Sequence, residues 1–136
     1  MLQKILCVDD DPITLMLYKM VIAKSSFTEE IITAKNGQEA LDYYDNLNAE
    51  NDFFCPELVF LDLNMPVMGG WEFLDNFTKE EYNQFNQKTK VIVLSSTIDP
   101  NDIEKSKKYS MVIDFMSKPV TKEMLEGLKQ RLNFQA

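Results

Sequence analysis

The sequence predicts an α/β fold, a doubly wound parallel sheet of five strands with five helices. Five short runs of β-type residues recur along the chain, helical patterns lie between them, and three of the runs are continuously apolar. Continuously apolar strands are typical of sheets that are buried on both faces. Strands that alternate with helices at this spacing favour right-handed crossovers and a parallel sheet. The 136 residues suit one domain, 1–136, and we expect no output domain.

The five predicted strands comprise residues 5–8, 31–33, 58–61, 91–94 and 112–116. The first helix is expected to begin at Pro12, because proline is well suited to the first position of a helix. Residues at three- and four-residue spacing follow it, and we expect this stripe to cover one face of the sheet. The stripe comprises Ile13, Leu17, Met20, Val21 and Lys24.

The other four helices are predicted from turn residues that precede apolar spacing. Two helical patterns follow Gly37 and Gly70, and Pro100 opens a segment that runs to Tyr109. Thr121 is a good N-cap for the last helix, because its hydroxyl can accept a backbone N–H of the first turn. The polar stretch 78–90 is expected to be the end of a helix and a surface loop.

Charge and composition exclude several classes of function. Fourteen basic against twenty-two acidic residues give a net charge of −8, which opposes binding to nucleic acid or to an anionic membrane. No apolar run approaches the ~20 residues of a membrane helix, and the start lacks a signal-peptide core, so we expect a cytoplasmic protein. Cys7 and Cys55 are predicted to be packing residues. The chain has no histidine, which disfavours zinc and copper sites.

The chemically interesting residues follow the predicted strands. Asp9, Asp10 and Asp11 come after the first strand, and Asp62 comes after the third. The fourth strand is followed by Ser95, Ser96 and Thr97, and the fifth by Ser117 and Lys118. In doubly wound folds, ligands bind at this carboxyl edge of the sheet. Asp11 precedes Pro12, so we interpret it as a helix N-cap.

The remaining carboxylates predict a site for Mg²⁺ and phosphoryl transfer. Asp9, Asp10 and Asp62 would repel one another without a cation, and oxygen ligands favour a hard one. With Lys118 and a divalent ion the charges balance, and a hydroxyl of Ser95 or Thr97 could bind an incoming oxygen. Asp62 is the expected phosphoacceptor because it ends a wholly apolar strand. Asp9 and Asp10 are better placed to hold metal directly or through water.

Five segments resemble the response-regulator receiver domains of bacterial two-component signalling. They are residues 5–12, 34–41, 61–70, 94–96 and 115–119, and together they span the whole chain. The resemblance implies a flavodoxin-like sheet of order 2-1-3-4-5. It also implies phosphorylation on Asp62, Mg²⁺ at Asp9 and Asp10, and a metal contact from the backbone carbonyl of Asn64. Lys118 would then pair with the phosphate.

The resemblance further implies a switch, partners and a non-enzymatic role. Ser95 and Phe115 stand at the switch positions, with Ser96 as the fallback for Ser95. The expected partners are a sensor histidine kinase or histidine phosphotransfer protein and an unknown downstream protein. Such a domain phosphorylates and dephosphorylates itself and is not a turnover enzyme. Asn64 and Thr97 match the two variable positions that tune dephosphorylation in the family.

This sequence departs from the family pattern at two positions. Gly69 stands where an acidic residue is common, and we expect a change in loop flexibility and no loss of function. Phe115 stands where tyrosine is common, so its inward and outward states would depend on packing alone. The sequence leaves open whether the peptide bond between Lys118 and Pro119 is cis or trans.

Three alternatives fit the sequence less well. A phosphorylation-independent interaction module on the same fold would not need the acidic pair, Asp62, Ser95 and Lys118, all of which are intact. A phosphotransferase of the haloacid-dehalogenase type would need a later acidic pair and a cap domain. A flavin-binding protein would need a phosphate loop after the first strand, where the three aspartates would repel the phosphate.

Overall fold

Five parallel strands form one sheet in the order β2-β1-β3-β4-β5 in the computed structural model, which describes residues 1–132. The strands are β1 (Leu2–Val8), β2 (Thr28–Ala34), β3 (Leu58–Asp62), β4 (Lys90–Ser95) and β5 (Val112–Ser117). The predicted fold class and strand order are confirmed. Each strand extends at least one residue beyond its predicted apolar run.

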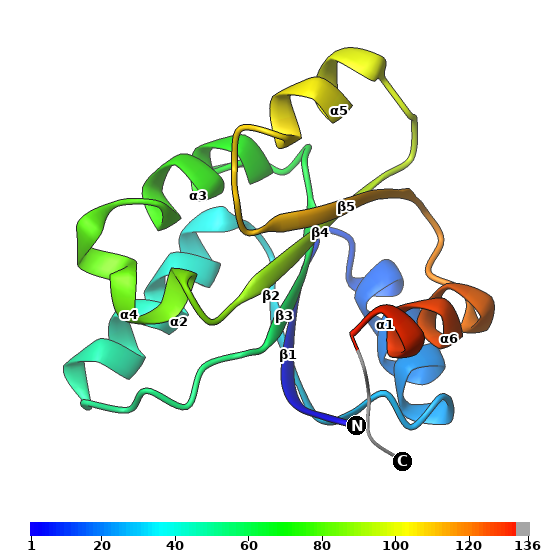
Figure 1. Cartoon of the computed structure of the whole chain (residues 1–136), viewed down its shortest axis with the longest axis horizontal. Coiled ribbons are helices and arrows are strands. Elements are labelled where there is room, and N and C mark those ends of the chain that lie inside the picture. Colours follow the sequence, from blue (N-terminus) through cyan, green and yellow to red (C-terminus); the bar gives the residue numbers. More distant parts are fainter. Residues whose placement is uncertain (133–136) are drawn as a thin grey trace.

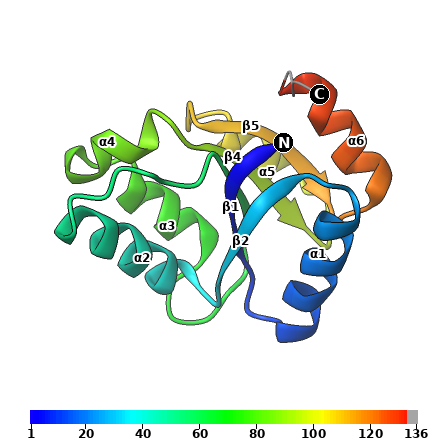
Figure 2. The ribbon, with the colours of Figure 1, turned by 90° about the horizontal axis from the view of Figure 1, so that it is seen from below.

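Helices cover both faces of the sheet (Figure 1). They are α1 (Pro12–Lys24), α2 (Gly37–Ala49), α3 (Gly70–Phe77), α4 (Asn83–Asn86), α5 (Pro100–Ser106) and α6 (Lys122–Arg131), with a 3-10 helix, η1 (Glu80–Tyr82). Figure 2 shows α1 and α6 on one side of the sheet and α2, α3 and α4 on the other. Within the described residues, none of these helices is long and apolar enough to cross a membrane. The cytoplasmic location stays a prediction.

Alternate side chains of the central strands enter two separate cores. Ile5 and Cys7 of β1 pack on the side of α1 and α6, whereas Leu6 and Val8 pack on the side of α2 and α3. β3 and β4 alternate in the same way, which is why their sequences are continuously apolar. Cys7 and Cys55 are both buried, as predicted. Burial raises the pKa of Cys7 to about 12, so its thiol stays protonated.

Both predicted helix caps are confirmed. The Asp11 carboxylate accepts the backbone N–H of Ile13 at 2.9 Å, at the start of α1. The Thr121 hydroxyl accepts the backbone N–H of Met124 at 3.2 Å, at the start of α6. Each cap satisfies a backbone donor that the first turn of the helix leaves free. The cap on α1 also fixes the direction in which the chain leaves β1.

The prediction of which face of α1 is buried was wrong. The buried side chains are Leu15, Tyr18 and Ile22. Of the predicted stripe, only Val21 is partly buried against the core, and the other four residues are exposed. The exposed apolar residues are Ile13 (62% exposed), Met16 (54%), Leu17 (50%) and Met20 (50%). α1 carries apolar residues on both faces, so their spacing alone could not select the face that packs on the sheet.

The prediction of a surface loop over residues 78–90 was also wrong, and with it the count of five helices. This stretch contains η1 and α4, which contribute Tyr82 and Phe85 to the core. The Phe85 ring lies 5.3 Å from that of Tyr44 between centroids, and the Tyr82 hydroxyl donates to Asp45 at 2.8 Å. Two apolar residues in a polar stretch form no periodic pattern from which such short helices could be predicted. α5 also ends earlier than predicted, at Ser106.

Candidate functional site

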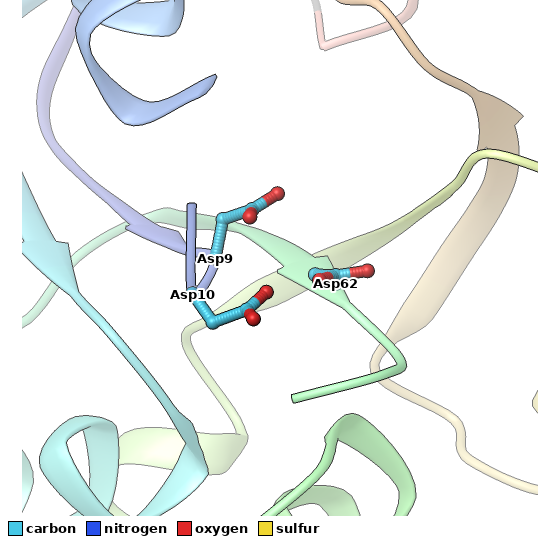
Figure 3. Close-up of side chains that lie close together, drawn as sticks. All are labelled: Asp9, Asp10 and Asp62. Carbon is cyan, nitrogen blue, oxygen red and sulfur yellow. The ribbon is translucent and has the colours of Figure 1, made fainter. Parts of the chain in front are cut away.

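Three carboxylates meet at the carboxyl edge of the two central strands. Val8 and Leu61 are register partners in β1 and β3, so the residues that follow them lie side by side. Asp9, Asp10 and Asp62 each place a carboxylate oxygen within 4.8 Å of the others (Figure 3). Asp9 and Asp62 are buried, and Asp10 is exposed. We call these three residues the acidic cluster.

Lys118 joins the acidic cluster from the end of β5. Its ammonium donates to Asp9 Oδ2 at 2.6 Å and lies 3.3 Å from Asp62 Oδ1. The Lys118 backbone N–H donates to the carbonyl of Ser95 at 2.8 Å, which holds the start of the following loop against β4. The Lys118–Pro119 peptide bond is cis, which answers the question that the sequence left open.

The pKa values of the site reflect burial and mutual charge. Burial raises the pKa of Asp62, Lys118 opposes this rise, and the charge of Asp9 adds to it, so that the net shift is upward. Burial acts to lower the pKa of Lys118, but the hydrogen bond to Asp9 and the charges of Asp62 and Asp9 outweigh it and raise that pKa. With the three carboxylates ionised, the formal charges of the acidic cluster and Lys118 sum to −2, and the all-oxygen donor set fits a hard divalent cation.

The loop between β3 and α3 is held close to the acidic cluster. The Gly70 N–H donates to the Leu63 carbonyl at 2.9 Å, and the Gly37 N–H donates to the Met68 carbonyl at 2.8 Å. Val67 has a φ of 68°, a left-handed conformation that is strained for a β-branched residue. Asn64 is exposed in this loop. Its backbone carbonyl as a metal ligand stays a prediction.

The backbone around Gly69 leaves little space for a larger residue, such as the acidic residue that is common at this position in the family. A Cβ atom at position 69 would lie 2.9 Å from the Leu63 carbonyl oxygen, so the loop would have to shift. Gly69 itself has a φ of −80°, which any residue can adopt. The consequence for loop flexibility stays a prediction.

The two predicted switch residues lie on neighbouring strands. Ser95 is buried at the end of β4, and its hydroxyl accepts the Thr97 N–H at 3.3 Å. Phe115 is the register partner of Val93, two residues before Ser95, and its side chain is partly buried. Phe115 also lines a surface hollow of about 220 Å³ between α5 and β5. Ser96 and Thr97 are exposed, and the role of Ser95 as the switch hydroxyl stays a prediction.

Sequence reasoning missed one polar residue beside this site. The side chain of Tyr18 is buried in α1 and interacts electrostatically with Asp9 and Asp62. The only signal in the sequence is a single tyrosine among apolar residues of a helix, which is usually a packing residue. Its proximity to the carboxylates follows from the crossing of α1 over the sheet.

The raised pKa of Asp62 predicts that Asp62→Asn stabilises the metal-free protein at neutral pH. The pKa of this carboxyl is higher in the folded state than in the unfolded state, so its protonated form stabilises the folded protein. That contribution to the free energy of unfolding is largest below pH 3.8 and is lost as the pH rises through the folded-state pKa. Asparagine does not ionise, so the variant does not lose this stability as the pH rises. We expect a higher free energy of unfolding at pH 7, with a gain that shrinks towards pH 4.

Urea unfolding in EDTA across this pH range measures the effect. Asp42→Asn is the control, because Asp42 lies exposed on α2, outside the acidic cluster. A loss of stability at pH 7 in Asp62→Asn would show that the attraction of Lys118 outweighs burial and repulsion.

The fold and the site together define a class of protein, the flavodoxin-like domains that carry an acidic centre at the carboxyl edge of the sheet. Comparison with known proteins makes the assignment specific. Residues 5–129 match the family model of the response regulator receiver domain. The chain belongs to this receiver domain family of two-component signalling, whose members are signalling phosphoacceptors and not turnover enzymes.

Similar structures and sequences agree with this assignment. A two-component response regulator from Cytophaga hutchinsonii is 30% identical, with a TM-score of 0.86 and coverage of 98% of each chain. Chemotaxis protein CheY of Bacillus subtilis is 29% identical over 98% of this chain and 100% of its own length. Hybrid signal transduction histidine kinase I of Dictyostelium discoideum is 28% identical over 90% of this chain. The chain spans only 7% of that kinase, and between 17% and 35% of three further curated relatives.

Proposed function

We propose that this receiver domain accepts a phosphoryl group on Asp62 in a Mg²⁺-dependent reaction and then changes its partner-binding face. The observation that carries the proposal is the meeting of three carboxylates and Lys118 at one edge of the sheet. A divalent cation would balance the formal charge of such a site, and the neutralised site could then accept an anion. The chain 1–136 would act as one receiver unit.

Each residue has a distinct role in this reaction. Asp9, Asp10, Asp62 and the Asn64 carbonyl would hold Mg²⁺, which supplies charge neutralisation for the phosphoryl group. A carboxylate oxygen of Asp62 attacks the phosphorus atom, and the bond from phosphorus to the donor breaks with its electron pair leaving on the donor. Phosphorylation replaces one negative charge on Asp62 by about two. Lys118 and the Ser95 hydroxyl would donate hydrogen bonds to the phosphoryl oxygens.

The switch would pass from Ser95 to Phe115. Movement of the Ser95 hydroxyl towards a phosphoryl oxygen leaves space beside β4 that the Phe115 ring can fill from the surface hollow. Phe115 has no hydroxyl to leave unsatisfied, so its inward state gains apolar burial. Phosphorylation can shift this equilibrium only through contacts that differ between the two states. The face formed by α5, β5 and α6 would then bind the downstream protein.

The exposed face of α1 supports a protein as the phosphodonor. Ile13, Met16, Leu17 and Met20 form a continuous apolar stripe that begins two residues after Asp11. We propose that a sensor histidine kinase or a histidine phosphotransfer protein covers this stripe while its phosphohistidine reaches Asp62. The same contact would remove water from both surfaces.

Incubation with acetyl phosphate tests the proposed chemistry without a protein donor. We expect intact-mass spectrometry to show a gain of one phosphoryl group in Mg²⁺, and none in EDTA or in Asp62→Asn. The Asp42→Asn control should be phosphorylated like the wild type. Absence of the gain in the wild type would favour the phosphorylation-independent interaction module, and a gain in Asp62→Asn would place the phosphoacceptor elsewhere.

A further inference from the structure

Helix α5 buries little of its own surface. It spans seven residues, and Ser106 is the one among them whose side chain is buried. The helix lies at the rim of the molecule (Figure 1). A helix this short is not stable alone, so its position depends on the side chains that attach it to its neighbours. α5 is also part of the face that we propose to bind the downstream protein.

Two sides of α5 contact different parts of the protein. Ile103, Ser106 and Lys107 line the surface hollow, together with residues of β5. Lys105 and Tyr109 contact α3 instead. Residues three or four apart share a side of a helix, and the turn continues to Tyr109, whose N–H donates to the Ser106 carbonyl at 3.1 Å. A movement of α5 towards β5 is therefore a movement away from α3.

Four side chains attach α5 to α3, and we call them the α3–α5 clasp: Trp71, Asp75, Lys105 and Tyr109. The Tyr109 ring stacks on that of Trp71 with centroids 5.9 Å apart, and its hydroxyl donates to Asp75 Oδ1 at 2.5 Å. The Lys105 ammonium lies 4.7 Å from the centroid of the Trp71 ring, which makes a cation–π contact. Trp71 and Asp75 are four residues apart, so one side of α3 meets one side of α5.

α3 is a fixed support for the clasp. Its side chains Phe73, Leu74 and Phe77 are fully buried in the core. At the start of the helix, a Cβ atom on Gly70 would lie 2.5 Å from the Asp62 carbonyl oxygen, so α3 packs closely on the end of β3. Of the two helices that the clasp joins, α5 is therefore the one that can move.

The proposed switch favours such a movement of α5. Phe115 lines the surface hollow between α5 and β5, and its ring leaves the hollow in the proposed inward state. A void with apolar walls is unfavourable, because the atoms that line it lose van der Waals contacts. α5 can close the void by moving towards β5. That movement separates Lys105 and Tyr109 from α3.

We infer that the α3–α5 clasp holds α5 in its resting position and opposes the change of the partner-binding face. The inference rests on the proposed function, because the clasp affects signalling only if phosphorylation changes that face. A weaker clasp would raise the fraction of the protein that is in the active state. A ligand that binds the active state would then bind with a higher apparent affinity.

Tyr109→Phe tests the clasp, with Tyr82→Phe as the matched control. Each substitution removes one hydrogen bond from a tyrosine to an aspartate, but the Tyr82 bond joins η1 to Asp45 of α2, at 2.8 Å. Urea unfolding should show a lower free energy of unfolding in both variants. Beryllium fluoride, a phosphoryl mimic, is then titrated in saturating Mg²⁺. Binding is followed by ¹⁹F NMR, because Trp71 fluorescence would respond to the substitution of Tyr109 itself.

We expect Tyr109→Phe to bind the mimic about fivefold more tightly than the wild type, despite its lower stability. Tyr82→Phe should bind the mimic like the wild type. Lys105→Met, which removes the cation from the Trp71 ring, should bind it about threefold more tightly. Lys108→Met is the control for this variant, because Lys108 is exposed in the turn after α5 and lies outside the clasp.

The outcomes separate this inference from the proposed function. If the wild type binds the mimic and Tyr109→Phe binds it equally or more weakly, the clasp persists in the active state, and the inference is overturned while the proposed function stands. Tighter binding by Tyr82→Phe would also overturn the inference, because lost stability alone would then explain the effect. If the wild type does not bind the mimic, the proposed function fails, and the inference fails with it.

Discussion

Lys118→Met should destabilise the metal-free protein by about 3 kcal/mol and tighten Mg²⁺ binding at the same time. Within the described chain, Lys118 is the cation that is ion-paired with Asp9 and Asp62, whose side chains are 1% and 9% exposed. Removal of one partner from a buried ion pair leaves the other charge uncompensated. The same removal eliminates an ammonium that competes with a metal ion for the Asp9 oxygen.

Urea unfolding with and without Mg²⁺ measures both effects. Metal that binds only the folded state stabilises it in proportion to its affinity, so Mg²⁺ should restore more stability to Lys118→Met than it adds to the wild type. Lys122→Met is the control, because Lys122 is exposed at the start of α6. An unchanged stability in EDTA, or weaker Mg²⁺ binding in Lys118→Met, would contradict the assignment of Lys118 as the counter-charge of the acidic cluster.

Gly70→Ala is expected to destabilise the fold by about 3 kcal/mol, although the substitution adds a single methyl group. A Cβ atom at position 70 would lie 2.5 Å from the Asp62 carbonyl oxygen and 3.0 Å from the Leu63 Cα. Both neighbours are backbone atoms at the end of β3, so they cannot move aside as a flexible side chain can. The first turn of α3 would have to withdraw from the sheet, and the position of Asp62 would change with it.

The chain contains its own control for this substitution. Gly127 lies within α6, and a Cβ atom there would have no neighbour within 4 Å. Gly127→Ala should therefore stabilise the protein by about 1 kcal/mol, as alanine does in a helix. Thermal unfolding of the two variants should shift the Tm in opposite directions. A similar Tm for Gly70→Ala and the wild type would show that the β3–α3 loop can rearrange at little cost.

The sequence was sufficient to predict the sheet and the positions of the chemical groups. Continuously apolar runs at β1, β3 and β4 identify strands buried on both faces, and parallel strands place the residues that follow them at one edge. The positions of Asp9, Asp62 and Lys118 follow from this topology without any knowledge of side-chain contacts. The structure adds the contacts themselves, in which the Lys118 ammonium lies 2.6 Å from Asp9 Oδ2 and 3.3 Å from Asp62 Oδ1.

The features that the sequence could not predict depend on long-range packing. The buried face of α1 was mistaken because both faces of that helix are apolar. The short helices after α3 depend on contacts of Tyr82 and Phe85 with residues far away in the chain. Tyr18 resembles any other core tyrosine until α1 is placed beside the carboxylates. In each case local pattern permits more than one arrangement, and tertiary contacts select among them.

If the outward face of α1 binds the phosphodonor as proposed, recognition of the donor and the chemistry depend on different residues. Its four apolar side chains are at least half exposed, and none of them belongs to the acidic cluster. Substitutions at such exposed positions usually cost little stability, and distant sites usually act independently. The residues that would select a donor can thus diverge while those that accept the phosphoryl group stay fixed. A duplicated copy of this domain could acquire a new donor by changes on one helix alone, with its reaction preserved.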